Sequence, residues 1–134
     1  MGEKITVEMT REQAQAVMMA TELLARLHIG QFKEITWHFL DRFKTSNGDY
    51  DSARRELADS LLDELARIIF GVNMYNRPDI SEKSITHERC WAVYTTIRHA
   101  LAWHDKPEGN PWSVAFDEPL PYGEPMPRCT VEDI

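Results

Sequence analysis

Proline sets the strongest limit on how this chain can fold. Six of the seven prolines lie between Pro107 and the end of the 134-residue sequence. Because proline removes a backbone donor and clashes with the preceding helical turn, this C-terminal part cannot be helical. Long helices are therefore expected only before Pro107. The length fits one domain, and we expect residues 1–120 to form it, with residues 121–134 as an extended, mobile tail.

Hydrophobic periodicity predicts four helices before the proline-rich part. The first begins at a capping box of Thr10 and Gln13, and Gly30 ends it. Asp51 is a plausible N-cap for the third, which Gly71 ends. The four helices are expected over about residues 11–29, 31–43, 52–70 and 86–104.

Two of these helices carry pronounced apolar stripes at helical spacing. The stripe of the third helix consists of Ala53, Leu57, Leu61, Leu62, Leu65 and Ile68. The stripe of the fourth consists of Trp91, Tyr94, Ile97 and Leu101. We expect the stripe of the fourth helix to pack on the core, so these four residues indicate no further function.

Two short strands are expected outside the helices. Ile5, Val7 and Met9 alternate with polar residues, and residues 113–117 show a similar alternation. Because a lone strand cannot satisfy its backbone, we expect the two strands to pair with each other or with another subunit. The predicted fold class is α+β: four helices with short N- and C-terminal strands that pair.

The charge distribution limits the possible partners. The net charge is −7, and residues 105–134 carry seven acids against two bases. No uniform basic footprint is present, so direct binding to nucleic acid is not expected, although residues 1–104 carry a net charge of only −2 and leave room for a local basic patch. Acidity also disfavours anionic membranes. No stretch approaches the roughly 18 apolar residues of a membrane span. Two cysteines do not form a disulfide framework, and we expect free thiols in a reducing cytosol.

The sequence contains no complete catalytic signature. Glu56 and Asp59 match half of the paired acidic motifs of all-α nucleoside triphosphate pyrophosphatases, which leaves a magnesium-dependent enzyme as one alternative. His99 and His104 are five residues apart, about 140° around the helix, so a metal site is not expected. Cys90 beside His87 is more typical of a small core residue than of a nucleophile. A non-enzymatic protein without a cofactor is therefore predicted.

The fourth helix provides the candidate ligand-binding residues. Arg98, His99 and Trp103 cannot all face the core, and together they could stack on a base and bind a phosphate. Further candidates lie in the preceding loop: Tyr75, Asn76 and Arg77. A structural alternative remains open, in which Trp103 packs under the C-terminal tail and Arg98 caps carbonyls or pairs with an acid such as Asp117 or Glu118.

Several strings resemble a group of small accessory proteins encoded in tailed-phage genomes. The resemblance covers most of residues 1–120 and lies in residues 30–32, 93–94, 97–99, 101–103 and 116–119. It carries over no catalytic residues. It implies an accessory factor that acts on host machinery, including antiviral defence.

These observations lead to one preferred function and two alternatives. We expect a phage accessory protein in the host bacterial cytoplasm, which sequesters a nucleotide-derived signalling molecule as a homo-oligomer. The first alternative is an acidic inhibitor that binds a host protein or nucleic-acid-handling complex. The second is the magnesium-dependent pyrophosphatase.

Overall fold

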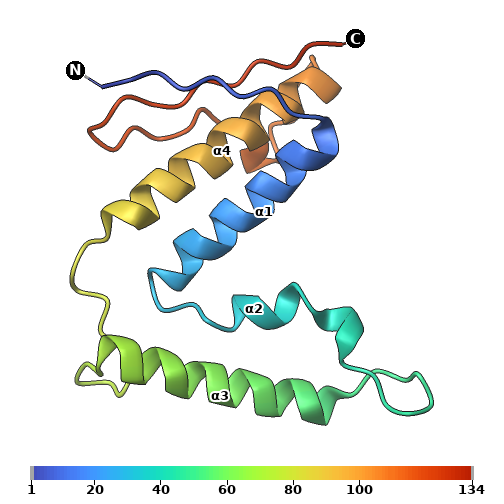
Figure 1. Cartoon of the computed structure of the whole chain (residues 1–134), viewed down its shortest axis with the longest axis vertical. Helices are drawn as coiled ribbons and strands as arrows, with labels where there is room; N and C mark the ends of the chain where they lie inside the picture. Colours follow the sequence, from blue (N-terminus) through green and yellow to red (C-terminus); the bar gives the residue numbers. More distant parts are fainter. Residues whose placement is uncertain (1, 134) are drawn as a thin grey trace. The chain divides into compact units, whose positions relative to one another are not determined.

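A computed structural model describes residues 2–133. The chain forms two compact units, each described here by itself: unit 1 comprises residues 2–22 and 90–133, and unit 2 comprises Leu23–Arg89. The helices are α1 (Arg11–Leu27), α2 (Glu34–Trp37), α3 (Ser52–Phe70) and α4 (Ile85–Asp105), with two 3-10 turns, η1 (Leu40–Arg42) and η2 (Val114–Phe116) (Figure 1). The predicted single domain over residues 1–120 stays a prediction.

The α+β prediction is wrong, because the described residues form helices and no β-strand or sheet. Residues 3–9 are extended, with Ile5 83% and Val7 65% exposed. Within residues 113–117 the chain forms the turn η2, and the Ser113 hydroxyl caps it by accepting from the Ala115 N–H at 3.3 Å. Alternating apolar and polar residues indicate that a segment has two different faces. A β-strand also needs a second strand whose backbone pairs with its N–H and C=O groups. The isolated bridges Lys44–Tyr50 and Val72–Pro78 only close loops.

The predicted second helix is also shorter than expected. Over residues 31–43 the chain forms only α2 and η1, separated by His38 and Phe39. Phe39 leaves the helical region with φ of −128°. Thr36 Oγ1 lies 2.8 Å from the Lys33 carbonyl oxygen and at the same distance from Asp59 Oδ1, so the two acceptors share its one proton. Branched and aromatic side chains, which lose rotamer freedom in a helix, dominate this segment and favour its early end.

The predictions for the three long helices are confirmed, including their caps. The Thr10 N–H donates to Gln13 Oε1 at 3.0 Å, and the Gln13 N–H donates to Thr10 Oγ1 at 3.1 Å. At α3 the Arg54 N–H donates to the Asp51 carboxylate at 3.1 Å. Gly30 and Gly71, just after α1 and α3, have φ of 79° and 73°. The side chains of Thr10, Gln13 and Asp51 satisfy backbone N–H groups that a helix start leaves without partners, whereas the two glycines supply the positive φ at which the chain leaves the helix.

In unit 1, residues before and after α4 in the sequence contact the C-terminal half of this helix. Arg11 forms an ion pair with Asp105 at 2.6 Å. The Trp103 ring packs edge-to-face on Phe116 at 5.1 Å between centroids, and its indole N–H donates to the Phe116 carbonyl at 3.0 Å. These contacts connect residues 11 and 116 to one helix, and they position the tail that follows.

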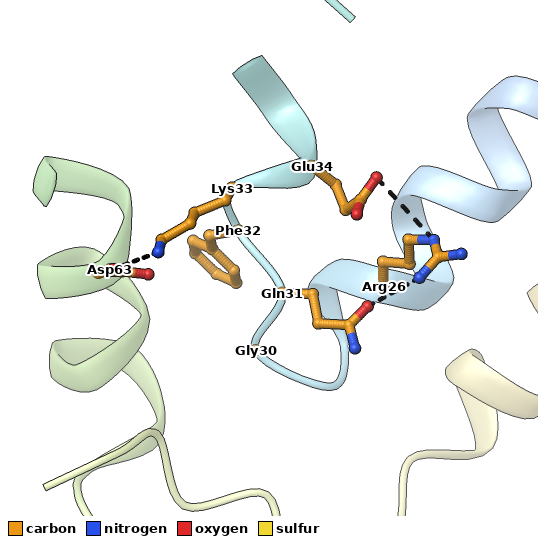
Figure 2. A pocket seen from close by; sticks show the side chains of 7 residues that line it. All are labelled: Arg26, Gly30, Gln31, Phe32, Lys33, Glu34 and Asp63. Atoms are coloured by element: carbon orange, nitrogen blue, oxygen red, sulfur yellow. Dashed lines mark hydrogen bonds and ion pairs between the residues drawn. The ribbon is translucent and has the colours of Figure 1, made fainter. Parts of the chain in front are cut away.

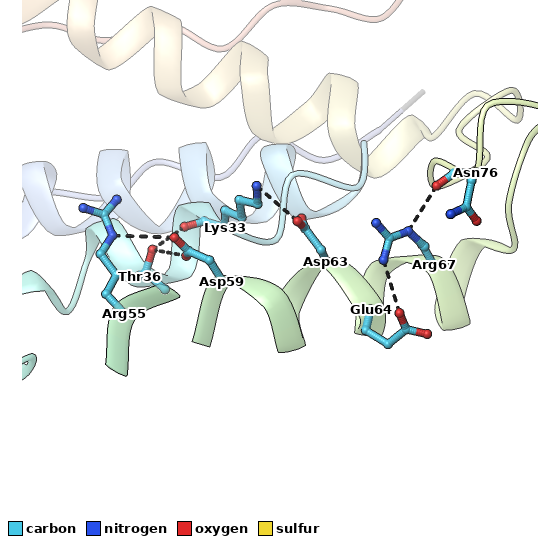
Figure 3. Close-up of polar contacts among 8 residues, drawn as sticks. All are labelled: Lys33, Thr36, Arg55, Asp59, Asp63, Glu64, Arg67 and Asn76. Carbon is cyan, nitrogen blue, oxygen red and sulfur yellow. Dashed lines mark hydrogen bonds and ion pairs between the residues drawn. The ribbon is translucent and has the colours of Figure 1, made fainter. Parts of the chain in front are cut away.

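In unit 2, α2 packs against α3 through polar side chains. The Thr36 hydroxyl donates to the Asp59 carboxylate at 2.8 Å, and Lys33 pairs with Asp63 at 3.1 Å (Figure 3). The aromatic ring of Phe32, 8% exposed, lies near Phe70 in the same interface. The side of α3 that faces α2 is therefore largely polar, whereas its aliphatic stripe lies elsewhere on the helix.

None of the helices in the described part of the chain is long and apolar enough to cross a membrane. The longest, α4, has 21 residues, but charged and polar side chains interrupt it throughout.

Candidate functional site

A pocket of about 370 Å³ lies in unit 1, between α4 and the proline-rich tail. Its volume falls in the range of small-molecule sites, roughly 300–1,000 Å³. The helix contributes Thr96, His99 and Ala100, and the tail contributes Glu118, Pro119, Met126, Pro127, Arg128, Cys129 and Thr130. One of the three site residues predicted on α4, His99, is thus part of a pocket.

Two polar atoms of α4 in this pocket have no partner. His99 Nδ1 and Thr96 Oγ1 are both buried from solvent, and neither makes a hydrogen bond within residues 2–133. The two residues are three apart on α4, so their side chains lie about 60° from each other around the helix. A buried polar atom without a partner costs roughly 1–3 kcal/mol. A ligand that hydrogen-bonds to both atoms would remove this cost, and neighbouring side chains would have to move to admit it, because both atoms are closed to solvent.

The tail supplies the charged groups of the pocket. Arg128 and Glu118 are both exposed lining residues, so a guanidinium and a carboxylate stand at the same site. Pro119, Met126 and Pro127 add apolar surface. An arginine favours phosphate or carboxylate groups, and a methionine side chain contacts aromatic rings favourably. The lining therefore suits a ligand with an anionic group and a flat apolar ring.

A contact near the end of the chain connects the tail to α4. His104 Nε2 lies 3.1 Å from the Asp133 carboxylate. Within the tail itself, the Tyr122 hydroxyl donates to Glu124 Oε2 at 3.1 Å, in the turn before the pocket-lining residues. The pocket-lining residues 126–130 lie between this turn and the contact with His104.

Trp103 is not among the lining residues of the pocket, and it contacts the protein's own residues. Its ring lies 6.4 Å from His99 between centroids and packs on Phe116. With its N–H donated to Phe116 and 40% of its surface exposed, only part of the ring faces solvent. The structure therefore shows the contact with the tail that formed one of the two interpretations of Trp103. Its predicted role as a stacking platform stays a prediction.

Arg98 lies beside Tyr94 on α4. Its Nη1 donates to the Tyr94 hydroxyl at 3.2 Å, and the guanidinium carbon lies 4.9 Å from the ring centroid. Burial and the hydrogen bond to Glu22 raise the pKa of Tyr94, while Arg98 opposes this shift. Arg98 is absent from the pocket lining, and its predicted contact with a tail acid is replaced by Tyr94.

The other predicted site residues lie in unit 2, in a loop that is hydrogen-bonded to itself. The Asn73 side-chain oxygen accepts from the N–H groups of Tyr75 at 2.9 Å and Arg77 at 3.2 Å. Asn76 adopts φ of 57°, and its carbonyl accepts from Arg67 at 3.1 Å. Tyr75 is 74% exposed. These three residues belong to unit 2, whereas Arg98, His99 and Trp103 belong to unit 1, and a site that joins the two sets stays a prediction.

Unit 2 contains a second pocket of about 390 Å³, shown in Figure 2. Its charged side chains are already engaged with each other. Lys33 pairs with Asp63 at 3.1 Å, and Arg26 lies 4.0 Å from Glu34 and donates to Gln31 (Figure 2). Two cations thus face two carboxylates, and a charged ligand would have to break these pairs. This pocket is a weaker candidate than the pocket of unit 1.

Of the two carboxylates that suggested a magnesium site, Glu56 and Asp59, only Asp59 makes polar contacts among the described residues. Asp59 accepts from Thr36 and lies 3.7 Å from Arg55 (Figure 3), whereas Glu56 is exposed. Within residues 2–133, no three His, Cys, Asp or Glu side chains gather in a way that could hold a metal ion. Nothing in this geometry favours the pyrophosphatase alternative.

Both cysteines are free, and neither is activated. Burial raises the pKa of the Cys90 thiol and that of the Cys129 thiol. His87, which stands three residues before Cys90, directs its Nδ1 to the Ala25 carbonyl at 2.8 Å. Cys129 nevertheless lines the unit 1 pocket, which makes it a natural reporter of occupancy.

Sequence reasoning missed most of the pocket. Thr96 lies between the apolar positions Tyr94 and Ile97 and was indistinguishable from an ordinary helix residue. Arg128 and Cys129 were assigned to an extended tail, because proline spacing gives no information about where such a tail packs. The available signal was Arg128 itself, one of only two bases after residue 104.

Comparisons with known proteins add no further constraint: no family model matches the sequence, and no curated protein or solved structure gives a match. The candidate function is therefore inferred from the geometry of the unit 1 pocket.

Proposed function

We propose that this protein binds a small nucleotide-type ligand in the unit 1 pocket and sequesters it without chemical conversion. One observation carries the proposal: Thr96 and His99 line a pocket of about 370 Å³, and each holds a buried polar atom, Oγ1 and Nδ1, that has no hydrogen-bond partner among the described residues. The lining contains no serine or lysine, and its only thiol is one whose pKa is raised, which favours binding over catalysis.

The chemistry of the lining supports a nucleoside phosphate over a simple anion. Arg128 provides the planar donors that suit a phosphate. Glu118 repels an anion but accepts hydrogen bonds from an amino or ribose hydroxyl group. Thr96 can donate or accept, so it adapts to either edge of a base. A ligand that carries both a phosphate and hydrogen-bond donors satisfies all of these groups at once.

The resemblance to tailed-phage accessory proteins supports a biological setting for this binding. In that setting the ligand is a nucleotide signal of host antiviral defence, and its capture keeps the signal below the level that activates an effector. The protein should then restore phage plating on a host that carries a nucleotide-signalled defence. A variant with an inactive pocket, His99→Phe, should not restore plating.

Isothermal titration calorimetry tests the binding directly. The probes are cyclic mono- and dinucleotides of adenine and guanine, with inorganic phosphate as a further arm. We expect saturable heat with one nucleotide class, one site per chain, and none with phosphate alone. Mass spectrometry of the recovered ligand should show it unchanged.

Adjacent threonines on α4 provide a matched control. Thr96→Val removes the unpartnered hydroxyl and should weaken binding roughly 5- to 30-fold, which corresponds to about 1–2 kcal/mol. Thr95→Val removes a hydroxyl that donates to the Trp91 carbonyl at 2.8 Å, outside the pocket lining, and should leave the affinity unchanged. Absence of heat with every nucleotide, from a folded sample, would falsify the proposal.

A further inference from the structure

In unit 2, helix α3 turns polar side chains toward α2 and leaves its aliphatic side chains exposed to solvent. Asp59, Asp63 and the fully buried Ala66 belong to the side that meets α2. The aliphatic side chains on the rest of the helix are exposed: Leu57 62%, Leu61 63%, Leu65 44%, Ile68 71% and Ile69 59%. A helix normally turns its apolar stripe toward a packing partner and its charges toward water.

The exposed side chains follow the spacing of a helix-pairing seam. Arg54, Ala58, Leu61, Leu65 and Ile68 are separated by four, three, four and three residues. This alternation is the a/d pattern by which one α-helix packs along another. Leu57 and Ile69 flank the seam and widen the apolar face. The pattern therefore fits a helical partner better than a small ligand or an extended peptide.

Charge favours a second copy of the chain as that partner. Although the protein carries a net charge of −7, the seam has Arg54 at one end, and Glu64 at its edge is paired with Arg67 at 3.2 Å. This face is thus close to neutral and does not repel its own copy. In a parallel pair Arg54 would meet Arg54, whereas an antiparallel pair separates the two guanidinium groups and opposes the helix dipoles.

The size of the face fits a weak, reversible dimer. Five aliphatic side chains, each about half exposed or more, leave roughly 300 Å² of apolar surface on one helix. With flanking polar side chains, two copies would bury on the order of 1,000 Å², at the low end of specific interfaces. The dimer should therefore depend on protein concentration in the micromolar range.

We infer that the protein forms a homodimer through antiparallel pairing of α3, along the face of Leu57, Leu61, Leu65, Ile68 and Ile69. This surface belongs to unit 2, so the inference stands independently of the ligand pocket in unit 1. Two copies paired in this way would present two pockets in one particle.

Sedimentation velocity of the native chain from about 5 to 200 µM tests the inference. We expect the weight-average mass to rise from one chain toward two over this range. Leu61→Glu and Ile68→Glu should each hold the protein as a monomer at the highest concentration. Both side chains are more than 60% exposed, so circular dichroism should show unchanged helicity.

Ser60→Glu is the matched control, because it adds the same charge to an exposed position of α3 outside the seam. It should leave the association constant within about threefold of the native value. A native chain that remains a monomer at 200 µM overturns the inference. A dimer that persists in both Leu61→Glu and Ile68→Glu overturns the assignment of this face, and a tetramer would contradict the antiparallel pair.

Discussion

Trp103 is the residue whose surroundings most change the interpretation of the sequence. An exposed tryptophan near a helix end suggested a stacking platform, but its indole N–H donates to Phe116 and its ring lies against Gly109. His99, one turn earlier, keeps a buried ring nitrogen without a partner among the described residues. The residues that we expect to recognise a ligand are therefore His99 and Thr96, and not Trp103.

Gly109 should be essential for the packing of Trp103. Its φ is +77°, and a Cβ there would lie 2.8 Å from Trp103 Cη2, while the ring cannot move without losing its bond to Phe116. Gly109→Ala should therefore lower the free energy of unfolding by about 2–4 kcal/mol, measured by urea denaturation.

Gly48 supplies the control for this prediction. Its φ of +83° is similar, but a Cβ there would meet nothing within 4 Å. Gly48→Ala should cost only the backbone strain, about 1 kcal/mol. Equal losses in the two variants would show that the Trp103 contact is unimportant.

Tyr94 should make the stability of the protein depend on alkaline pH. Burial and the Glu22 hydrogen bond raise its pKa above the ordinary 10.0. Since the unfolded chain then loses this proton first, the stabilisation is complete below pH 10 and is lost as the pH rises through the raised folded pKa. Chemical denaturation from pH 8 to 11 should show a shallower decline for Tyr94→Phe than for the native chain.

Tyr75→Phe is the comparison variant, because it removes the same hydroxyl group from a side chain that is 74% exposed. If the free energy of unfolding of Tyr94→Phe declines as steeply above pH 10 as that of the native chain, the pKa of Tyr94 is not raised in the folded protein.

At the scale of elements, sequence reasoning located the three long helices from periodicity and capping residues. Thr10 with Gln13 and Asp51 identified the helix starts, because these side chains bond to local backbone N–H groups. The strands failed for the opposite reason: a strand needs a distant partner, and local alternation at Ile5 and Val7 does not specify one. For the same reason no local pattern could show that Arg128 lines a pocket with His99.

The cap of α3 gives an element-scale prediction. Asp51→Ala removes the acceptor for the Arg54 N–H and should lower the free energy of unfolding by about 1 kcal/mol. Asp49→Ala, at an exposed position before the cap, should change it by less than about 0.5 kcal/mol. Thermal denaturation of both variants checks the difference, and an unchanged midpoint for Asp51→Ala would contradict the role of this cap.

For the whole molecule, the two proposed surfaces belong to different units. The ligand pocket lies between α4 and the tail in unit 1, and the association face lies on α3 in unit 2. Variants of one surface should therefore leave the other intact: Leu61→Glu should bind nucleotide normally, and Thr96→Val should still dimerise. The account as a whole depends most on whether a nucleotide occupies the unit 1 pocket.

Alkylation of the two cysteines measures that occupancy most directly. Cys129 lines the pocket, whereas Cys90 lies outside it on α4 and serves as an internal control in the same molecule. The rate of N-ethylmaleimide modification at each thiol is followed by peptide mass spectrometry, with each cyclic adenine or guanine nucleotide at 1 mM and without it. We expect that one nucleotide class slows modification of Cys129 at least about tenfold and leaves the rate at Cys90 unchanged. Equal rates at Cys129 with and without every nucleotide would contradict this expectation.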